Sequence, residues 1–386
     1  MSAPHLLPRF TAYLAAFTLL GVGCPSPAPG PVGDDDDAAN DDDAADDDDD
    51  DAADDDDSAD GDPWDAVRDA IDSAPITDLT VLIGTAQGPQ FSFSKGDSSP
   101  TDAYLIASAS KWLSSLTLLA AVDEGLLTLG DRPQDHLSWW TDDPSDPRSE
   151  VTLEQLLSFT SGFAGGEDSV PCVEDPDSTL DACAQTIYAD FFEHEPGTTF
   201  IYGPSHLQVA GAMVSAATGD RFNRVFRDRI ATPLGLASTT AFAVPSLDNP
   251  RVAGGATASA EDYGTILTAL VSGQLLSPAS MEVLGEDHTG AGVTMAVVPN
   301  AATVNGEWHY ALGCWRECGE DPYSTTCDEP GVLSSPGAFG FYPWWDIERG
   351  FWGVLAIQLV QAGGGAGTTV PLGQQWAELA AEALGR

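Results

Sequence analysis

The stretch LIASASKWLSSLTLLAAVDEG, residues 105–125, places a serine three positions before a lysine, at the start of an apolar helical pattern. From Leu113 to Val122 the apolar residues recur at helical spacing. Because three residues make nearly one helical turn, Ser108 and Lys111 share a face, which brings the amine within hydrogen-bond reach of the hydroxyl. The helix N-terminus adds backbone N–H groups where an oxyanion would form. The stretch therefore predicts a serine nucleophile beside a partly desolvated lysine that can accept its proton.

The chain contains a second copy of the pattern, SFSK at Ser92 to Lys95, and these two lysines are the only ones in the sequence. Residues 79–85 and 90–95 are short apolar or alternating runs separated by a Gly-containing turn, which predicts a β-hairpin. On a strand, positions three apart point to opposite faces, so Ser92 and Lys95 cannot meet. We interpret Lys95 as a solvated charge at the end of a strand.

The N-terminal part differs in composition from the rest of the chain. Residues 1–23 end in FTAYLAAFTLLGVG, an apolar run that is short for a membrane-spanning helix and typical of a signal peptide. Cys24 follows in GVGC and resembles the lipidated cysteine of a bacterial lipoprotein. We expect an exported protein of the bacterial cell envelope that contacts the outer leaflet of a membrane only through this lipid. Plain secretion and an uncleaved anchor are the alternatives.

Residues 24–62 form the second segment, which is dominated by aspartate. Like charges repel along it and it has little to bury, so we expect a disordered tether, with a calcium-binding segment as the alternative. The formal net charge of the chain is −47. Residues 63–386 are still strongly acidic, which argues against nucleic acid as a partner. They are numerous enough for a large core, in one compound domain or two interleaved ones.

The cysteines after the tether are distributed as two pairs and one single residue. Cys172 and Cys183 bracket a loop rich in Asp, Pro and Ser, and Cys318 and Cys327 bracket GEDPYSTT. Each pair is expected to form a disulfide in an exported chain. Cys314 is expected to pack as a small apolar residue. The histidines lack partners at metal-binding spacing, so neither a metal nor another cofactor is expected.

Four segments, in this order, resemble the serine β-lactamase and penicillin-binding-protein superfamily, in its branch of class C β-lactamases, D-alanyl-D-alanine carboxypeptidases and esterases. They are LIASASKWLSSLTLLAAVDEGLLTLGDRPQDHL (105–137), VTLEQLLSFTSGF (151–163), FIYGPSHLQVAGAMVSAATG (200–219) and AGGATASAEDYGTILTAL (253–270). The resemblance implies the α+β, β-lactamase/transpeptidase-like fold. An antiparallel sheet from both chain ends is then flanked by helices, with a mainly helical insertion at roughly residues 110–285. Strand-like runs near both ends and helical patterns between them agree with this expectation.

The resemblance also assigns catalytic roles. Ser108 matches the nucleophile, Lys111 its partner, and Tyr202 the tyrosine that relays protons to and from the serine. A phenol can do this only where neighbouring cations stabilise its anion, and Lys111 is the lysine placed to help. A core tyrosine with a satisfied hydroxyl is the alternative for Tyr202.

The motif around the tyrosine departs from the family pattern. The family's Asn two residues after the tyrosine is replaced by Pro204, which starts a helix well but donates no hydrogen bond. Ser205 is our candidate for a substrate-binding polar group in its place, and His206 is the alternative.

The third family motif is a cation, any residue and a glycine on a strand beside the nucleophile. In SSPGAFGF, Ser335, Pro336 and Gly337 occupy it, so the cation is missing. We expect Ser335 and Gly337 to line the substrate site and the Ala338 N–H to complete the oxyanion hole with that of Ser108. The letters HTG at residues 288–290 precede their expected place and are interpreted as an unrelated loop.

These features predict an exported serine hydrolase that forms an acyl-enzyme on Ser108. A family cation would bind a substrate carboxylate, so its loss favours an ester, or an amide without that charge. The alternatives are a D-alanyl-D-alanine carboxypeptidase or penicillin-binding protein of the cell envelope, and a non-catalytic binding protein. The expected partner is a small-molecule or peptide acyl compound, and the oligomeric state is left open.

Overall fold

The computed structural model describes residues 61–166, 169–299, 306–320, 323–327, 331–359 and 365–386. The expected signal peptide, Cys24 and nearly all of the acidic tether lie outside these residues, so this division of the chain stays a prediction. The helices are α1 (Asp65–Ser73), α2 (Ala109–Asp123), α3 (Leu153–Leu157), α4 (Leu180–Asp190), α5 (Ser205–Thr218), α6 (Phe222–Phe226), α7 (Ala260–Val271), α8 (Pro278–Leu284) and α9 (Gly365–Ala383). There is also a π-helical turn at Arg227–Ala231, and there are 3-10 turns at Pro133–Asp135, Pro147–Glu150, Pro171–Glu174 and Thr325–Cys327. The strands are β1 (Leu79–Thr85), β2 (Gly88–Lys95), β3 (Tyr104–Leu105), β4 (Thr199–Ile201), β5 (Ala241–Phe242), β6 (Ala256–Ala258), β7 (Thr294–Val297), β8 (His309–Tyr310), β9 (Trp315–Glu317), β10 (Val332–Ser334), β11 (Tyr342–Asp346) and β12 (Phe351–Ala356).

Within the described residues, the main sheet has seven strands in the order β2-β1-β12-β11-β10-β9-β8, and every neighbouring pair is antiparallel. It joins strands from both ends of the described chain, and the predicted hairpin is confirmed as β1 and β2. Two small sheets, β3-β6-β5 and β4-β7, lie outside it. The expected mixed α and β architecture is therefore confirmed.

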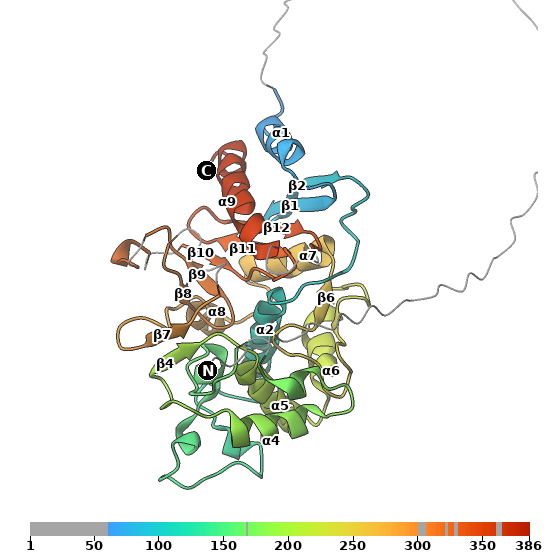
Figure 1. The fold of residues 1–386 in the computed structure, drawn as a ribbon. Helices are drawn as coiled ribbons and strands as arrows, with labels where there is room; N and C mark the ends of the chain where they lie inside the picture. Colours follow the sequence, from blue (N-terminus) through green and yellow to red (C-terminus); the bar gives the residue numbers. More distant parts are fainter. Residues whose placement is uncertain (1–60, 167–168, 300–305, 321–322, 328–330, 360–364) are drawn as a thin grey trace, which may run out of the picture. The chain divides into compact units, whose positions relative to one another are not determined.

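Helices cover both faces of the main sheet (Figure 1). Trp352 and Gly353 are consecutive residues of β12, so their side-chain positions lie on opposite faces of the sheet. The Trp352 ring lies against Gly264 of α7, where a Cβ would come within 2.8 Å of it. On the other face, the Trp344 ring fills the space over Gly353 and lies close to Gly373 of α9. The absence of side chains at these glycines lets α7 and α9 pack closely on the sheet.

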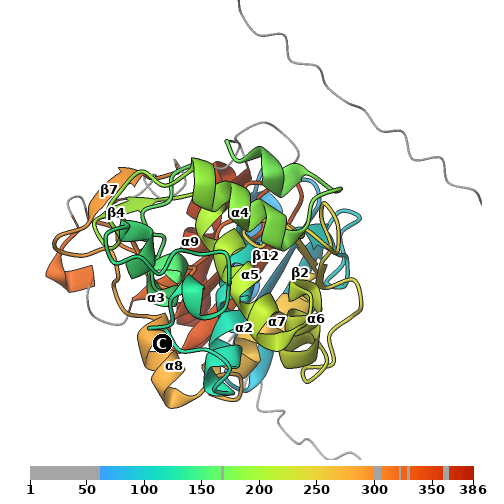
Figure 2. The same cartoon turned by 90° about the horizontal axis from the view of Figure 1, so that it is seen from below.

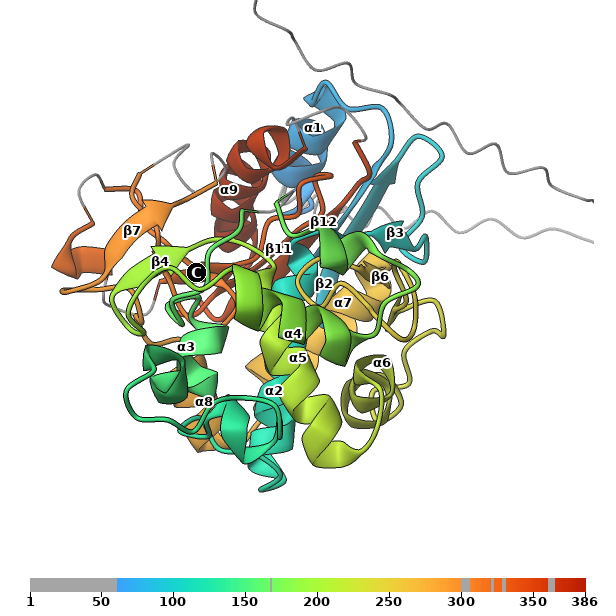
Figure 3. The same ribbon diagram turned by 60° about the horizontal axis from the view of Figure 1, so that its bottom comes forward.

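As expected, the mainly helical region lies in sequence between the strands of the main sheet, after β2 and before β8. Helix α2 runs through the interior of this region. Twelve of the fifteen α2 residues are buried, which is typical of a helix surrounded by protein on all sides. It packs against α5, α6 and α8 (Figure 2). Figure 3 shows α4 lying along α5, with α3 and α6 on either side. Among the helices in the described part of the chain, none combines the length and apolar character that a membrane span requires.

Both expected disulfides are present. Cys172–Cys183 joins the 3-10 turn at Pro171–Glu174 to α4, and Cys318–Cys327 closes the loop after β9. Cys314 is buried and is not part of a disulfide, and burial raises the pKa of its thiol. The thiol therefore stays protonated and packs as an apolar group, as expected.

Lys95 is not the solvated charge that the sequence suggests. Its Nζ donates hydrogen bonds to the carbonyls of Asp72 at 2.6 Å and Ala74 at 2.9 Å. These carbonyls lie at the C-terminal end of α1, where helical carbonyls lack partners and the helix dipole is negative. Lys95 therefore caps α1, so the expectation of a solvated side chain is wrong.

Candidate active site

Ser108 and Lys111 meet at the start of α2, as the helical spacing predicts. Ser108 immediately precedes the helix and is 5 % exposed, and Lys111 is 1 % exposed. The Lys111 Nζ lies 2.9 Å from the Ser108 Oγ and 3.0 Å from the carbonyl oxygen of Ala253. A hydroxyl and an amine are thus held together in a site that is largely shielded from bulk water.

The residue before the serine has an unusual backbone conformation. Ala107 has a φ of +45°, in the left-handed region that non-glycine residues rarely adopt. The Ile106 N–H donates to the Ala256 carbonyl at 3.1 Å, which fixes the chain just before this turn. Such strain costs about 1–3 kcal/mol and persists only where the surrounding structure holds it, often at functional sites. The turn directs the chain from β3 into α2 and so positions Ser108.

The segment that sequence analysis assigns to the third family motif, residues 335–337, lies directly beside this turn. The Ser335 hydroxyl, in a side chain 2 % exposed, donates to the Ser108 carbonyl at 2.8 Å. A Cβ on Gly337 would overlap the Ile106 carbonyl, so only glycine allows this close approach. Ala338 follows in an exposed turn. While its hydrogen bond holds, the Ser335 hydroxyl can contact a substrate only as an acceptor, and its substrate-binding role stays a prediction.

Tyr202 follows β4 and brings a phenol ring to the lysine. The Lys111 Nζ lies 4.5 Å from the centroid of the Tyr202 ring. The ring is stacked on Trp315, with centroids 5.2 Å apart, and the Tyr202 N–H donates to the Val297 carbonyl at 3.0 Å. The structure therefore brings together the three predicted catalytic side chains, which come from separate segments of the chain.

His206, the alternative that the sequence offers to Ser205, is buried and supports the tyrosine segment. The His206 Nε2 lies 2.8 Å from the Ile201 carbonyl, which can only accept, so Nε2 carries the proton. Nδ1 then accepts from the Ser161 hydroxyl at 2.8 Å. The ring stacks on Phe159, a buried residue with a φ of +61°. Burial lowers the pKa of His206 to about 4, against the effect of its bond to Ile201, so it is neutral at physiological pH.

The structure places Ser205, our candidate for the family's missing Asn, in the interior of the protein. Its side chain is fully buried, and its hydroxyl donates to the Ala164 carbonyl at 2.7 Å. Pro204 occupies the N-cap position of α5, and His206, which follows Ser205, is bonded to Ser161 and Ile201. The hydroxyl of Ser205 therefore faces the protein interior, and this placement gives no support to a substrate contact. A single sequence does not show which way the first residue of a helix points.

The loop that contains HTG belongs to another part of the structure. The His288 N–H donates to the Tyr310 carbonyl at 3.0 Å, and its Nδ1 lies 3.3 Å from Glu154. These contacts attach the loop to β8 and α3, whereas the segment beside Ser108 follows β10. They agree with the interpretation of HTG as an unrelated loop.

The fold is that of the serine β-lactamase and transpeptidase class. The Beta-lactamase family model matches residues 85–370, and the chain belongs to this family.

Two curated relatives match part of the chain. Protein Flp of Staphylococcus aureus strain MW2 is 28 % identical over 160 residues, which cover 42 % of this chain and 32 % of Flp. Lovastatin esterase of Penicillium rubens is 28 % identical over 210 residues, which cover 46 % of this chain and 52 % of the esterase. The matches thus span about a third and about half of the length of these relatives.

Solved structures extend the similarity of fold over most of the chain. A β-lactamase structure from Bacteroides dorei has a TM-score of 0.69 at 24 % identity and covers 81 % of this chain and 96 % of its own. EstCE1, a hydrolase with promiscuous acyltransferase activity, has a TM-score of 0.64 at 18 % identity and covers 83 % and 97 %. At these identities the similarity shows the fold alone.

Proposed function

We propose that this protein is a serine hydrolase that cleaves esters through an acyl-enzyme on Ser108. The observation that carries the proposal is the buried contact of 2.9 Å between the Lys111 Nζ and the Ser108 Oγ. As a neutral amine, Lys111 accepts the hydroxyl proton when the serine attacks, and the strained turn at Ala107 keeps the hydroxyl in place.

Acylation transfers the acyl group from the alcohol to the serine. The Ser108 Oγ forms a bond to the ester carbonyl carbon while its proton moves to the Lys111 Nζ. The carbonyl electron pair moves onto oxygen, and the N–H groups of Ser108 and Ala338 stabilise this oxyanion. When the intermediate collapses, the bond to the leaving alkoxide breaks, and the alkoxide takes a proton relayed through Tyr202 from Lys111.

Deacylation repeats these steps with water. Water loses a proton through Tyr202 to Lys111 as its oxygen attacks the acyl carbon. Collapse of this second intermediate breaks the bond to Ser108, which recovers the proton, and the carboxylic acid leaves. An alcohol in place of water would give acyl transfer instead of hydrolysis, through the same proton movements.

The proposal of an ester substrate follows from the third motif. A charge-assisted contact to a substrate carboxylate contributes about 1.5–3 kcal/mol, and a serine in place of the cation cannot supply it. The Ser335 hydroxyl is also bonded to the Ser108 carbonyl. The name of one relative, lovastatin esterase, agrees with ester chemistry.

We further propose that the protein is exported and anchored by a lipid on Cys24. The two disulfides support export, since such bonds persist in oxidising compartments. Metabolic labelling with a radioactive fatty acid tests the anchor: we expect incorporation that Cys24→Ser abolishes. Equal labelling of both proteins would contradict lipidation at this residue.

Hydrolysis of p-nitrophenyl acetate and nitrocefin by the purified protein tests the proposed activity. We expect ester hydrolysis to fall at least about 1,000-fold in Ser108→Ala. Ser92→Ala, which alters the serine of the other Ser-x-x-Lys copy, should hydrolyse the ester at the rate of the unaltered protein. Equal rates for the Ser108→Ala variant and the unaltered protein would overturn the proposal. Covalent labelling of Ser108 by fluorescent penicillin, without ester turnover, would instead favour a carboxypeptidase or penicillin-binding protein.

A further inference from the structure

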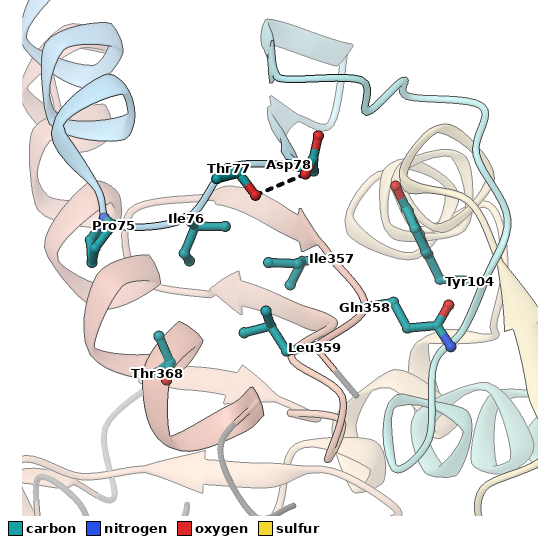
Figure 4. Close-up of a pocket in the computed structure, with 9 residues that line it drawn as sticks. All are labelled: Pro75, Ile76, Thr77, Asp78, Tyr104, Ile357, Gln358, Leu359 and Thr368. Carbon is teal, nitrogen blue, oxygen red and sulfur yellow. Dashed lines mark hydrogen bonds between the residues drawn. The ribbon is translucent and has the colours of Figure 1, made fainter. Parts of the chain in front are cut away.

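A pocket of about 470 Å³ lies at one end of the main sheet (Figure 4). Its centre is apolar, formed by the buried Ile76 and Ile357 together with Leu359. Thr77 and Asp78 lie above these side chains in the view, and Thr368 of α9 lies below them. A pocket of this size, apolar inside with a few polar groups at its rim, is typical of a small-molecule site.

Two walls of this pocket continue into the segments that surround Ser108. One wall is Tyr104 of β3, four residues before Ser108, so their Cα atoms are at most about 14 Å apart. The other includes Leu359, whose N–H donates to the Phe339 carbonyl at 2.7 Å. Phe339 directly follows Ala338, the residue proposed to complete the oxyanion hole. The pocket is therefore within reach of a group attached to a carbonyl at Ser108.

The charge at the rim restricts what the pocket can bind. The Asp97 backbone N–H and the Thr77 hydroxyl hold the pKa of Asp78 below its ordinary value, so this carboxyl is ionised at neutral pH. None of the described residues that line the pocket is basic. An anionic group would therefore be repelled, while an uncharged apolar chain would be desolvated against Ile76, Ile357 and Leu359.

We propose that this pocket binds the uncharged apolar acyl chain of the ester, an inference that rests on the proposed hydrolase function. The acyl carbonyl lies at Ser108 and the chain extends past Tyr104 into the pocket. The preferred substrates are then esters of medium-chain fatty acids, whose chain can reach the apolar centre, over acetate, whose chain cannot.

Rates with p-nitrophenyl octanoate and p-nitrophenyl acetate test this assignment. Thr77→Trp and Thr368→Trp add bulk at exposed rim positions and should leave the fold intact. We expect each to lower kcat/KM for the octanoate at least about tenfold, because the lost burial of a few methylene groups suffices, and to change acetate less than about twofold. Thr239→Trp, at an exposed position that does not line the pocket, is the matched control and should change neither rate. An equal loss for both esters, or an equal loss in the control, would overturn the proposal.

Binding measured without turnover separates this inference from the proposed function. Ser108→Ala and the double variant Ser108→Ala with Thr368→Trp are titrated with p-nitrophenyl octanoate by calorimetry. We expect the double variant to bind at least about tenfold more weakly. Equal affinities would refute the acyl pocket even if the unaltered protein hydrolyses esters. A difference in affinity would support the pocket even if hydrolysis does not depend on Ser108.

Discussion

The Ser335 hydroxyl donates a hydrogen bond of 2.8 Å to the backbone carbonyl of Ser108. Sequence analysis predicts this position for the family's cation, and the serine found there supports the backbone of the proposed nucleophile. Together with the close approach of Gly337 to the Ile106 carbonyl, this bond fixes the segment after β10 against the turn before α2. Under the proposed mechanism, Ser335 therefore helps to hold the nucleophile in place.

Replacement of Ser335 tests its role as a positioning residue. In Ser335→Ala we expect kcat to fall on the order of tenfold with KM nearly unchanged, because the nucleophile is less well placed while substrate contacts persist. The free energy of unfolding should fall by about 1 kcal/mol. Steady-state kinetics and urea denaturation measure these effects. As a control, Ser334→Ala removes a buried hydroxyl from the adjacent position and should leave kcat unchanged. A raised KM in Ser335→Ala would show instead that Ser335 binds substrate.

The two lysines should respond differently to the same substitution. Lys111→Met keeps a long side chain in a buried position but removes the amine, so kcat for an ester should fall at least about 100-fold. Lys95→Met removes the cap of α1 and should lower the melting temperature with kcat unchanged. Kinetic assays and thermal unfolding of both variants measure this contrast. A Lys111→Met enzyme with normal kcat would exclude this lysine as the proton acceptor.

The strained turn before the nucleophile makes a third prediction. Ala107→Gly removes the Cβ that disfavours a φ of +45°, so stability and kcat should be close to those of the unaltered protein. Ala107→Val adds a β-branched side chain that this conformation disfavours strongly. We expect it to lower the free energy of unfolding by at least about 1–3 kcal/mol and to reduce kcat. Equal behaviour of the two variants would mean that the turn is not strained in solution.

His206 makes stability depend on pH in a defined range. Its pKa is about 4 in the folded chain and has an ordinary value of 6.5, so the unfolded chain binds more protons between these values. The free energy of unfolding should therefore fall as the pH decreases from 6.5 to about 4, by up to roughly 3 kcal/mol, with no contribution above this range. Urea denaturation across this range should show a shallower fall in His206→Gln. Curves of the His206→Gln variant that run parallel to those of the unaltered protein would contradict the assignment.

Sequence reasoning worked best for features that depend on local spacing or on the order of motifs. Ser108 and Lys111 are three residues apart on a helix, so their contact follows from helical geometry alone. Tyr202 was placed with them because its segment matches the family pattern. The two disulfides could be predicted because the cysteines of each pair are close in sequence and bracket a short loop.

The features that sequence reasoning missed depend on contacts between distant segments. The bond from Ser335 to the Ser108 carbonyl spans 227 positions, and no pattern indicates it. Lys95 ends a strand in the sequence pattern, but its role as a helix cap depends on where α1 packs. Ala107 and Phe159 have positive φ values although neither residue type favours that region. Only the assembled fold shows these relationships.

Mass spectrometry of the protein quenched during turnover of p-nitrophenyl octanoate tests the proposed mechanism most directly. The mechanism predicts an octanoyl adduct on the peptide that contains Ser108, absent from Ser108→Ala, and accumulating when deacylation is slowed by Tyr202→Phe. Ester turnover with no adduct on Ser108, or an adduct on another residue at the same rate in Ser108→Ala, would contradict it.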